Sequence, residues 1–257
     1  MAKVKQPKPA LYFLILSVTL VLLFIGMVMI ASASSVVAYL GHKDSFFFLW
    51  RQLAYIAAGM ILLYLASRVD YRLLRKLSPV GLALSIVSLV LVFVPGVGQV
   101  AGGAQRWIGV GEFSFQPSEL AKLAFILYTA DILTRKKWKN ESLIGLAVPL
   151  GVPLLIISAL ILAQPDLGTL LIILISVFAL LFLSGIRFRE LIPLGVGGSA
   201  AVFALIWVEP YRRKRWLAFL DPEADPLKNG FQYLQSLMAF GSGGLQGVGL
   251  GLSRQKF

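Results

Sequence analysis

The stretch LYFLILSVTLVLLFIGMVMIA, residues 11–31, decides the fold class of this chain. It carries no charge and matches the roughly 20 residues that an α-helix needs to cross the hydrocarbon core of a membrane. The basic tail before it resembles the start of a signal peptide, but the run is too long and Ser32-Ala33-Ser34 is a weak cleavage site. We therefore predict a retained membrane span near residues 11–33, after a tail formed by residues 1–10.

Uncharged runs of similar length recur along the chain. They predict six further spans, at residues 47–67, 77–95, 117–133, 142–163, 167–186 and 191–208. The span at 117–133 is short and contains Glu119, Lys122 and Asp131. Hydrophobic residues make up 58% of the chain and charged residues 14%, against roughly 45–50% and about 25% in soluble domains. The sequence therefore predicts an all-α polytopic membrane protein with seven visible transmembrane helices.

The segment after the seventh predicted span, residues 209–257, differs from the rest. It begins EPYRRKRWLAFLDPEADP, which is dense in charge and proline, and residues 229–253 then carry no charge. The glycines and glutamines of that uncharged part would leave backbone and amide groups that lipid cannot satisfy. We predict a surface helix near residues 231–240 and a Gly-rich loop, at the start of a large extracytoplasmic loop, rather than an eighth span.

The basic residues indicate the orientation of the chain. Alternate loops carry most of them: Lys3, Lys5, Lys8; Arg68, Arg72, Arg75, Lys76; Arg135, Lys136, Lys137, Lys139; Arg187 and Arg189. Because short cytoplasmic loops are enriched in Lys and Arg, we predict a cytoplasmic N-terminus. The net charge of +12 does not indicate nucleic acid, since the basic residues lie between hydrophobic spans. An anionic membrane face or an anionic substrate explains it better.

The sequence excludes several kinds of catalytic site. It has no cysteine, and His42 is its only histidine, so no His-based triad or zinc site can form. No Gly-rich motif has the P-loop pattern. No cofactor and no metal ligand are therefore assigned, and a requirement for a divalent cation stays open.

Gln116-Pro117-Ser118-Glu119 interrupts the apolar pattern with the features of a helix start. Proline suits the first helical position, and a glutamate in the first turn suits the helix dipole. A helix start does not explain Lys122, which is three residues after Glu119 and can pair with it. Ionisable residues within a span are functional candidates. A structural ion pair and a functional polar cavity both remain open.

Gln164-Pro165-Asp166 is a second such helix start, on the same predicted side of the membrane. It is explained by helix capping alone. However, two helix N-termini that point at one external region would suit a ligand that carries phosphate.

Further cations lie on that predicted external side. Arg106 precedes Trp107, whose simplest role is anchoring at the membrane interface. Arg212 and Arg215 belong to a basic cluster that either binds an external anion or is partly neutralised by Asp221, Glu223 and Asp225. With the family resemblance given below, these positions are assigned to a substrate-binding wall, and the structural accounts of each stay open: Arg106, Trp107, Gln116, Glu119, Lys122, Gln164, Asp166, Arg212 and Arg215.

Three stretches resemble the SEDS family of bacterial division, elongation and sporulation proteins, which comprises FtsW, RodA and SpoVE. They are GGAQRWI…GVGEFSFQPSELAK, QPDLGT and FLDPEADP…GFQYLQSLMAFGSGGLQGVGLGLSRQK, in this order. The ending GVGLGLSRQKF is more similar to the FtsW and SpoVE branch than to RodA. The resemblance implies about ten spans in the bacterial inner membrane and polymerisation of lipid II into peptidoglycan strands at its outer face. It also implies a class B penicillin-binding transpeptidase and other division proteins as partners.

In the family, the essential aspartate lies in a Pro-Glu…His-Thr-Asp-Phe motif just after the SRQK stretch, which here would follow Phe257. The resemblance therefore implies that residues 1–257 form one incomplete transmembrane domain without a catalytic residue. We expect that this chain alone does not polymerise lipid II. The alternatives are a lipid II flippase and a non-catalytic division scaffold.

Overall fold

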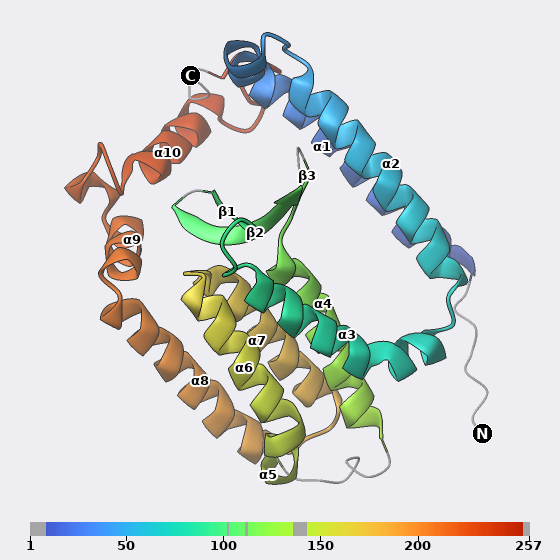
Figure 1. Cartoon of the computed structure of the whole chain (residues 1–257). Helices are drawn as coiled ribbons and strands as arrows, with labels where there is room; N and C mark the ends of the chain where they lie inside the picture. The colour runs from blue at the N-terminus through green and yellow to red at the C-terminus, as the bar shows by residue number, and fades with distance from the viewer. Residues whose placement is uncertain (1–8, 102, 111–112, 136–142, 254–257) are drawn as a thin grey trace. The chain divides into compact units, whose positions relative to one another are not determined.

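The computed structural model describes residues 9–101, 103–110, 113–135 and 143–253 (Figure 1). The chain divides into two compact units. The first unit contains residues 1–68 and 205–257, and the second contains residues 69–204.

A long helical segment corresponds to each predicted span. These segments are α1 (Pro9–His42), α2 (Phe47–Arg68), α3 (Tyr71–Leu91), α4 (Pro117–Thr134), α5 to α6 (Leu143–Leu146 and Val152–Ala163), α7 (Leu167–Leu183) and α8 (Phe188–Val208). Within the described residues, five helices are long and apolar enough to cross a membrane, in α1, α2, α3, residues 144–163 and α8. The helix α7 is apolar but shorter, and α4 contains three charged residues. The prediction of an all-α polytopic membrane protein is confirmed.

The first unit pairs α1 with α2 as a hairpin and adds three short elements, α9 (Pro210–Leu220), the 3-10 helix η2 (Pro222–Ala224) and α10 (Phe231–Gly243). With 13 residues, α10 is about 20 Å long, too short to cross a membrane. The loop after it has positive φ angles at Gly244, Gly247, Gly249 and Gly251. The predicted helix and Gly-rich loop are thus confirmed. Gly251 N donates to Ser32 Oγ at 2.7 Å, which joins this loop to α1.

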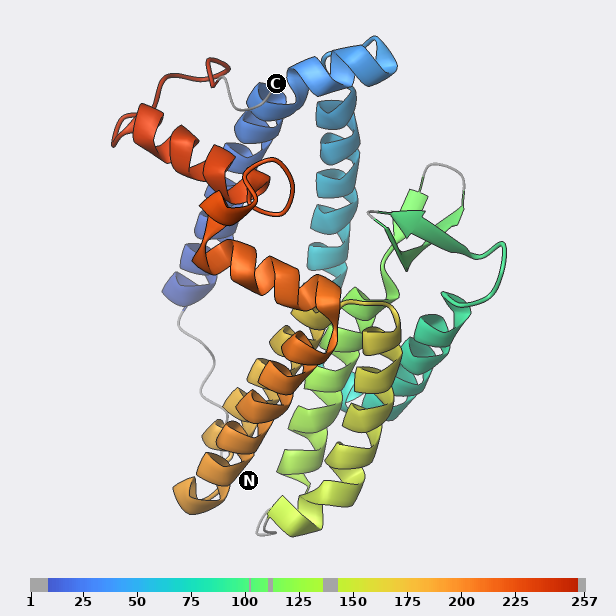
Figure 2. The same ribbon diagram turned by 90° about the vertical axis from the view of Figure 1, so that its left-hand side faces the viewer.

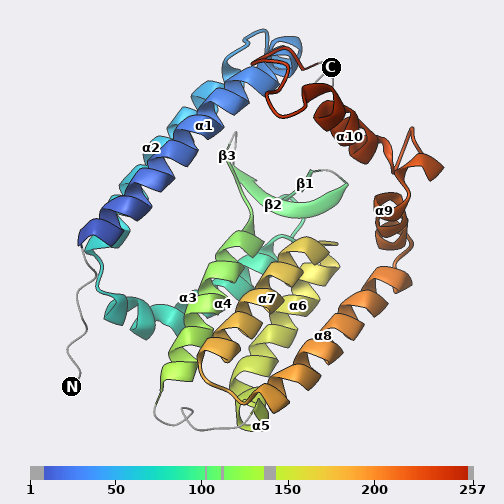
Figure 3. The same ribbon diagram turned by 180° about the vertical axis from the view of Figure 1, so that it is seen from behind.

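The second unit is a bundle in which α3, α4, α6 and α7 pack together (Figures 2 and 3). Its core includes Phe125 of α4, Ile157 and Ile161 of α6 and Ile173 of α7, all fully buried. The small residues Ser78 and Ser85 of α3 and Ser118, Ala121 and Ala124 of α4 are also buried. Small side chains let membrane helices approach closely, which explains the extensive contact of α3 with α4.

One helix of this bundle departs from α geometry. Between α5 and α6 the chain forms the π-helical turn η1 (Ala147–Gly151), which contains Pro149. Proline lacks the N–H that would continue the α-helical pattern. The hydroxyl of Tyr128 on α4 donates to the Pro149 carbonyl oxygen at 3.1 Å, so the turn is anchored to the neighbouring helix.

A small antiparallel sheet, not predicted from the sequence, lies between α3 and α4 in the chain. It consists of β1 (Gly98–Ala101), β2 (Ala104–Val110) and β3 (Phe113–Phe115), in the order β1-β2-β3. Gln105 Nε2 donates to the Val92 carbonyl oxygen at 2.8 Å, which ties β2 to the end of α3. The Gly-Gly pair at 102–103 between two short apolar runs was the available hairpin signal.

We expect Gly98→Ala to destabilise the second unit. A Cβ at Gly98 would overlap the Val92 carbonyl oxygen and the Gln105 side chain, and overpacking of this kind costs about 1–3 kcal/mol. The measurement is thermal unfolding of the detergent-purified protein. Gly81→Ala on α3 is the control, because a Cβ there meets nothing within 4 Å. Equal melting temperatures for the two variants would contradict the packing described here.

Candidate functional site

Two helices of the second unit begin side by side. Pro117 is the first residue of α4, with Gln116 at its N-cap. Asp166 is the N-cap of α7 and accepts hydrogen bonds from Thr169 N at 3.2 Å and from Thr169 Oγ1 at 2.8 Å. Both helix starts predicted from the sequence are confirmed.

A direct hydrogen bond joins these two helix starts. Gln116 Nε2 donates to Asp166 Oδ2 at 3.2 Å, and Asp166 is buried. The carboxylate thus caps one helix and holds the other, so its oxygens are already engaged as acceptors. Two positively polarised helix ends consequently lie next to each other, as the sequence analysis predicted.

The predicted pairing of Glu119 with Lys122 is also confirmed. Lys122 Nζ lies 2.8 Å from Glu119 Oε1, and the side chains are 19% and 55% exposed, respectively. The ammonium group therefore lies against the bundle, one turn inside the start of α4, whereas the carboxylate is open to its surroundings. We call Gln116, Glu119, Lys122 and Asp166 the helix-start cluster.

Arg106 has a structural role that the sequence did not reveal. From β2 it donates Nε to the Gln164 carbonyl oxygen at 2.9 Å, and its Nη2 donates to the Pro165 carbonyl oxygen. These carbonyls follow the last turn of α6, where the helix dipole stabilises a cation. Arg106 thereby fixes the sheet to the corner between α6 and α7. Its predicted part in anion binding stays a prediction.

Gln164 lies in the interior of the second unit. Its side chain is almost fully buried and donates Nε2 to the Leu89 carbonyl oxygen at 3.2 Å. Its Oε1 is buried without a hydrogen-bond partner among the described residues. The structure thus assigns Gln164 a contact between α6 and α3, and its predicted contact with substrate remains a prediction.

The other predicted site residues are Trp107, Arg212 and Arg215. Trp107 is on β2, opposite Gln99 of β1. Arg212 and Arg215 are on α9 of the first unit. Arg212 Nη1 donates to the Leu205 carbonyl oxygen at 3.3 Å, and the Arg215 guanidinium lies 5.7 Å from the Tyr211 ring centroid.

The acidic residues after α9 do not neutralise that basic cluster in the described part of the chain. No ion pair joins Arg212 or Arg215 to residues 221–225 there. Asp225 instead accepts from Asn229 Nδ2 at 2.8 Å. This hydrogen bonding holds the pKa of Asp225 below its usual range.

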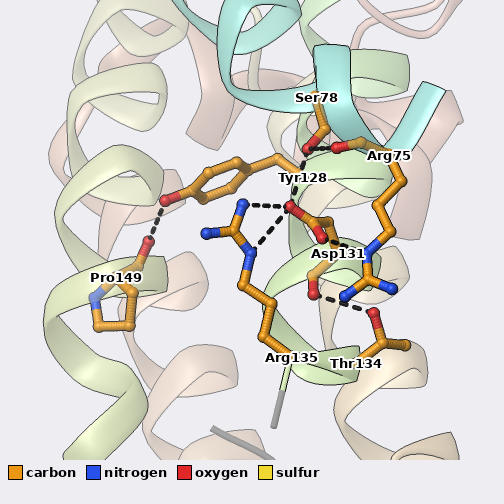
Figure 4. Close-up of polar contacts among 7 residues, drawn as sticks. All are labelled: Arg75, Ser78, Tyr128, Asp131, Thr134, Arg135 and Pro149. Carbon is orange, nitrogen blue, oxygen red and sulfur yellow. Dashed lines mark hydrogen bonds and ion pairs between the residues drawn. The ribbon is translucent and has the colours of Figure 1, made fainter. Parts of the chain in front are cut away.

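A second polar cluster lies at the other end of α4, and the sequence analysis missed it (Figure 4). Asp131 accepts from Arg75 Nε at 2.8 Å, from Ser78 Oγ at 3.2 Å and from Arg135 Nε at 3.1 Å. We call these four residues the Arg–Asp–Arg cluster. The spacing of Asp131 and Arg135 by four was a detectable signal, but Arg75 is 56 residues away in the chain.

No group of three or more metal-ligating side chains occurs among the described residues.

Known proteins are similar to this chain over most of its length. A family model described as a cell cycle protein, FTSW_RODA_SPOVE, matches residues 12–257. The chain belongs to the FtsW/RodA/SpoVE family. This confirms the resemblance to the SEDS family that the three sequence stretches indicated.

Curated members of the FtsW/RodA/SpoVE family are similar over nearly the whole chain. The stage V sporulation protein E of Bacillus subtilis is 43% identical, over 98% of this chain and 69% of its own length. The "Probable peptidoglycan glycosyltransferase FtsW" of Nitrosococcus halophilus is 37% identical, over 97% of this chain and 64% of its own length. The chain thus spans about two thirds of the length of these relatives.

Two solved structures share the fold of this chain. One, from work on the structural coordination of polymerization and crosslinking by a peptidoglycan synthase complex, is 33% identical with a TM-score of 0.67. The match covers 88% of this chain and 66% of that one. The rod shape determining protein RodA of Thermus thermophilus is 29% identical with a TM-score of 0.51, and the match covers 72% and 57% of the two chains.

Proposed function

We propose that the protein to which this chain belongs is a peptidoglycan glycosyltransferase of cell division that polymerises lipid II at the outer face of the bacterial inner membrane. The observation that carries the proposal is the helix-start cluster. The N-termini of α4 and α7 are held together by the Gln116–Asp166 hydrogen bond, and Lys122 lies one turn inside. The two helix N-termini, Lys122 and Arg106 contribute positive charge at this end of the bundle, and the carboxylates of Asp166 and Glu119 offset part of it.

That positive charge suits the reaction. A growing glycan strand linked to a lipid pyrophosphate loses this group when a sugar hydroxyl attacks the strand. Cations and helix N-termini near the departing pyrophosphate stabilise the negative charge that develops on it. In the proposal Lys122 and Arg106 of the second unit supply cations, and the parts of Arg212 and Arg215 stay predictions from the sequence.

The attacking hydroxyl needs a carboxylate base, and the helix-start cluster does not supply one. Asp166 is engaged by Thr169 and Gln116, and Glu119 is paired with Lys122. We therefore assign both carboxylates to the wall of the substrate site, with Gln116, Gln164 and Trp107. In the proposal the base is instead the aspartate of the motif that, in the family, comes after the SRQK stretch.

The partners and the orientation are part of the same proposal. The solved relative whose title joins polymerization and crosslinking supports a class B penicillin-binding transpeptidase as partner, together with other division proteins. The alternation of basic loops supports a cytoplasmic N-terminus, which places residues 209–257 and the helix-start cluster on the external side.

The test is polymerisation of labelled lipid II by the full-length gene product, purified in detergent, with glycan strands resolved on a gel. We expect strands to form and Arg106→Ala to slow their formation, because it removes a cation and the tie between β2 and the α6–α7 corner. Movement of lipid II across liposome membranes without any strands would favour a flippase instead. An unchanged rate for Arg106→Ala would show that Arg106 has no part in the reaction and only bonds the carbonyl oxygens of Gln164 and Pro165.

A further inference from the structure

The Arg–Asp–Arg cluster carries more positive charge than its own contacts neutralise. Asp131 is the one carboxylate, with a side chain only 2% exposed, and both Arg75 and Arg135 pair with it. One guanidinium would be enough to balance a buried carboxylate. Within the described residues no second carboxylate pairs with either arginine, so a net charge of about one unit remains.

The arginines also keep unused hydrogen-bond donors. Arg75 engages Asp131 through Nε, and Arg135 through Nε and Nη2. In the described part of the chain, both terminal nitrogens of Arg75 and Nη1 of Arg135 have no further partner. The two side chains are 49% and 44% exposed. Figure 4 shows these terminal nitrogens pointing away from Asp131, one guanidinium on each side of it.

Helix electrostatics explain only one of the two arginines. Arg135 follows the C-terminus of α4, where a cation is favourable. Arg75 is in the second turn of α3, toward its N-terminus, where the helix dipole gives a cation no stabilisation. Arg75 is held by Asp131, and its exposed terminal nitrogens can bind a further anion.

The location of the cluster indicates what that anion is. From Pro117 to Thr134, α4 has 18 residues and is about 27 Å long, close to the roughly 30 Å of a hydrocarbon core. One end of α4 carries the helix-start cluster, so the Arg–Asp–Arg cluster at its other end lies at the level of the opposite headgroups. Guanidinium groups bind phosphate through paired N–H donors.

We propose that Arg75 and Arg135, held in place by Asp131 and Ser78, form a binding site for the phosphate of an anionic phospholipid headgroup. The site is separate from the proposed polymerisation site and does not depend on that activity. Asp131 fixes the orientation of the Arg75 and Arg135 guanidinium groups. Their remaining N–H groups then bind the phosphate oxygens.

The experiment is native mass spectrometry of the detergent-purified full chain, titrated with phosphatidylglycerol and, for comparison, with neutral phosphatidylcholine. We expect selective retention of phosphatidylglycerol. Arg75→Gln and Arg135→Gln should each weaken it by about fivefold or more, since an arginine near the headgroups contributes roughly 1 kcal/mol. Arg72→Gln removes an equal charge from the same end of α3 without touching the cluster, and should leave retention nearly unchanged.

A double variant distinguishes a lipid site of defined geometry from a nonspecific attraction between lipid and local net charge. Arg75→Gln with Asp131→Asn leaves the local net charge as it is in the wild type, and it leaves no unpaired carboxylate that could prevent folding. We expect this variant to lose selective retention. Retention equal to wild type, or an equal loss with Arg72→Gln, would overturn the proposal, as would displacement of the lipid by similar concentrations of glycerol phosphate.

Discussion

Exchanging Glu119 and Lys122, by Glu119→Lys together with Lys122→Glu, is expected to lower lipid II polymerisation by about a hundredfold or more. The exchange moves the cation that we propose faces the departing pyrophosphate. The ion pair itself can re-form after the exchange, since the two positions stay three residues apart on one helix face. Reversing the charges near the start of α4 costs about 0.3–1 kcal/mol for each residue through the helix dipole, so the protein should still fold. The measurements are strand formation by the full-length gene product and its melting temperature.

This exchange distinguishes a functional cation from a structural pair. If the pair only stabilises α4, the exchanged protein should polymerise lipid II at nearly the wild-type rate, and our assignment of Lys122 is wrong. Lys122→Met is the companion variant, because it removes the cation and keeps the length and apolar stem of the side chain. Glu119→Gln should have a smaller effect, since the Glu119 side chain is more than half exposed.

Replacing Asp166 with alanine is expected to give the largest loss of stability among these variants. It removes the cap of α7 and leaves Gln116 Nε2 and the Thr169 hydroxyl without their acceptor. A lost cap costs about 0.5–2 kcal/mol and a buried unsatisfied polar group about 1–3 kcal/mol. We expect a total of about 2–4 kcal/mol by thermal or denaturant unfolding in detergent.

Asp166→Asn is the matched control. Its side-chain oxygen can still accept from Thr169 N, and its amide can donate to Gln116 once the Gln116 amide is rotated by 180°. Asp166→Asn should therefore keep most of the stability that Asp166→Ala loses. Equal losses for the two variants would show that the negative charge, rather than the hydrogen bonds, holds the two helix starts together.

Features encoded by adjacent residues were predictable from the sequence. The starts of α4 and α7 follow from Pro117 and Asp166, and the Glu119–Lys122 pair from a spacing of three. The failure of residues 229–253 to form a span follows from their glycine content, and α10 is indeed short. In each case the physical cause acts within about one helical turn.

Contacts between distant parts of the chain were not predictable. Arg106 was expected to face a ligand, but it bonds backbone carbonyls 58 and 59 residues away. Arg75 and Arg135 were counted as loop cations, whereas both pair with Asp131. The sheet was missed because glycine-rich strands have weak β-propensity and are specified by their pairing. Such contacts depend on which helices become neighbours.

The charges at the two ends of α4 have a consequence for membrane insertion. Between Lys122 and Asp131 only eight uncharged residues remain, about 12 Å of helix. A charged residue within a span opposes partitioning from the translocon into lipid by up to about 3 kcal/mol. This helix therefore has little tendency to enter the bilayer by its own hydrophobicity. Because Asp131 is paired with Arg75 of the preceding helix, we expect α4 to enter lipid together with α3, so that its insertion is coupled to tertiary folding.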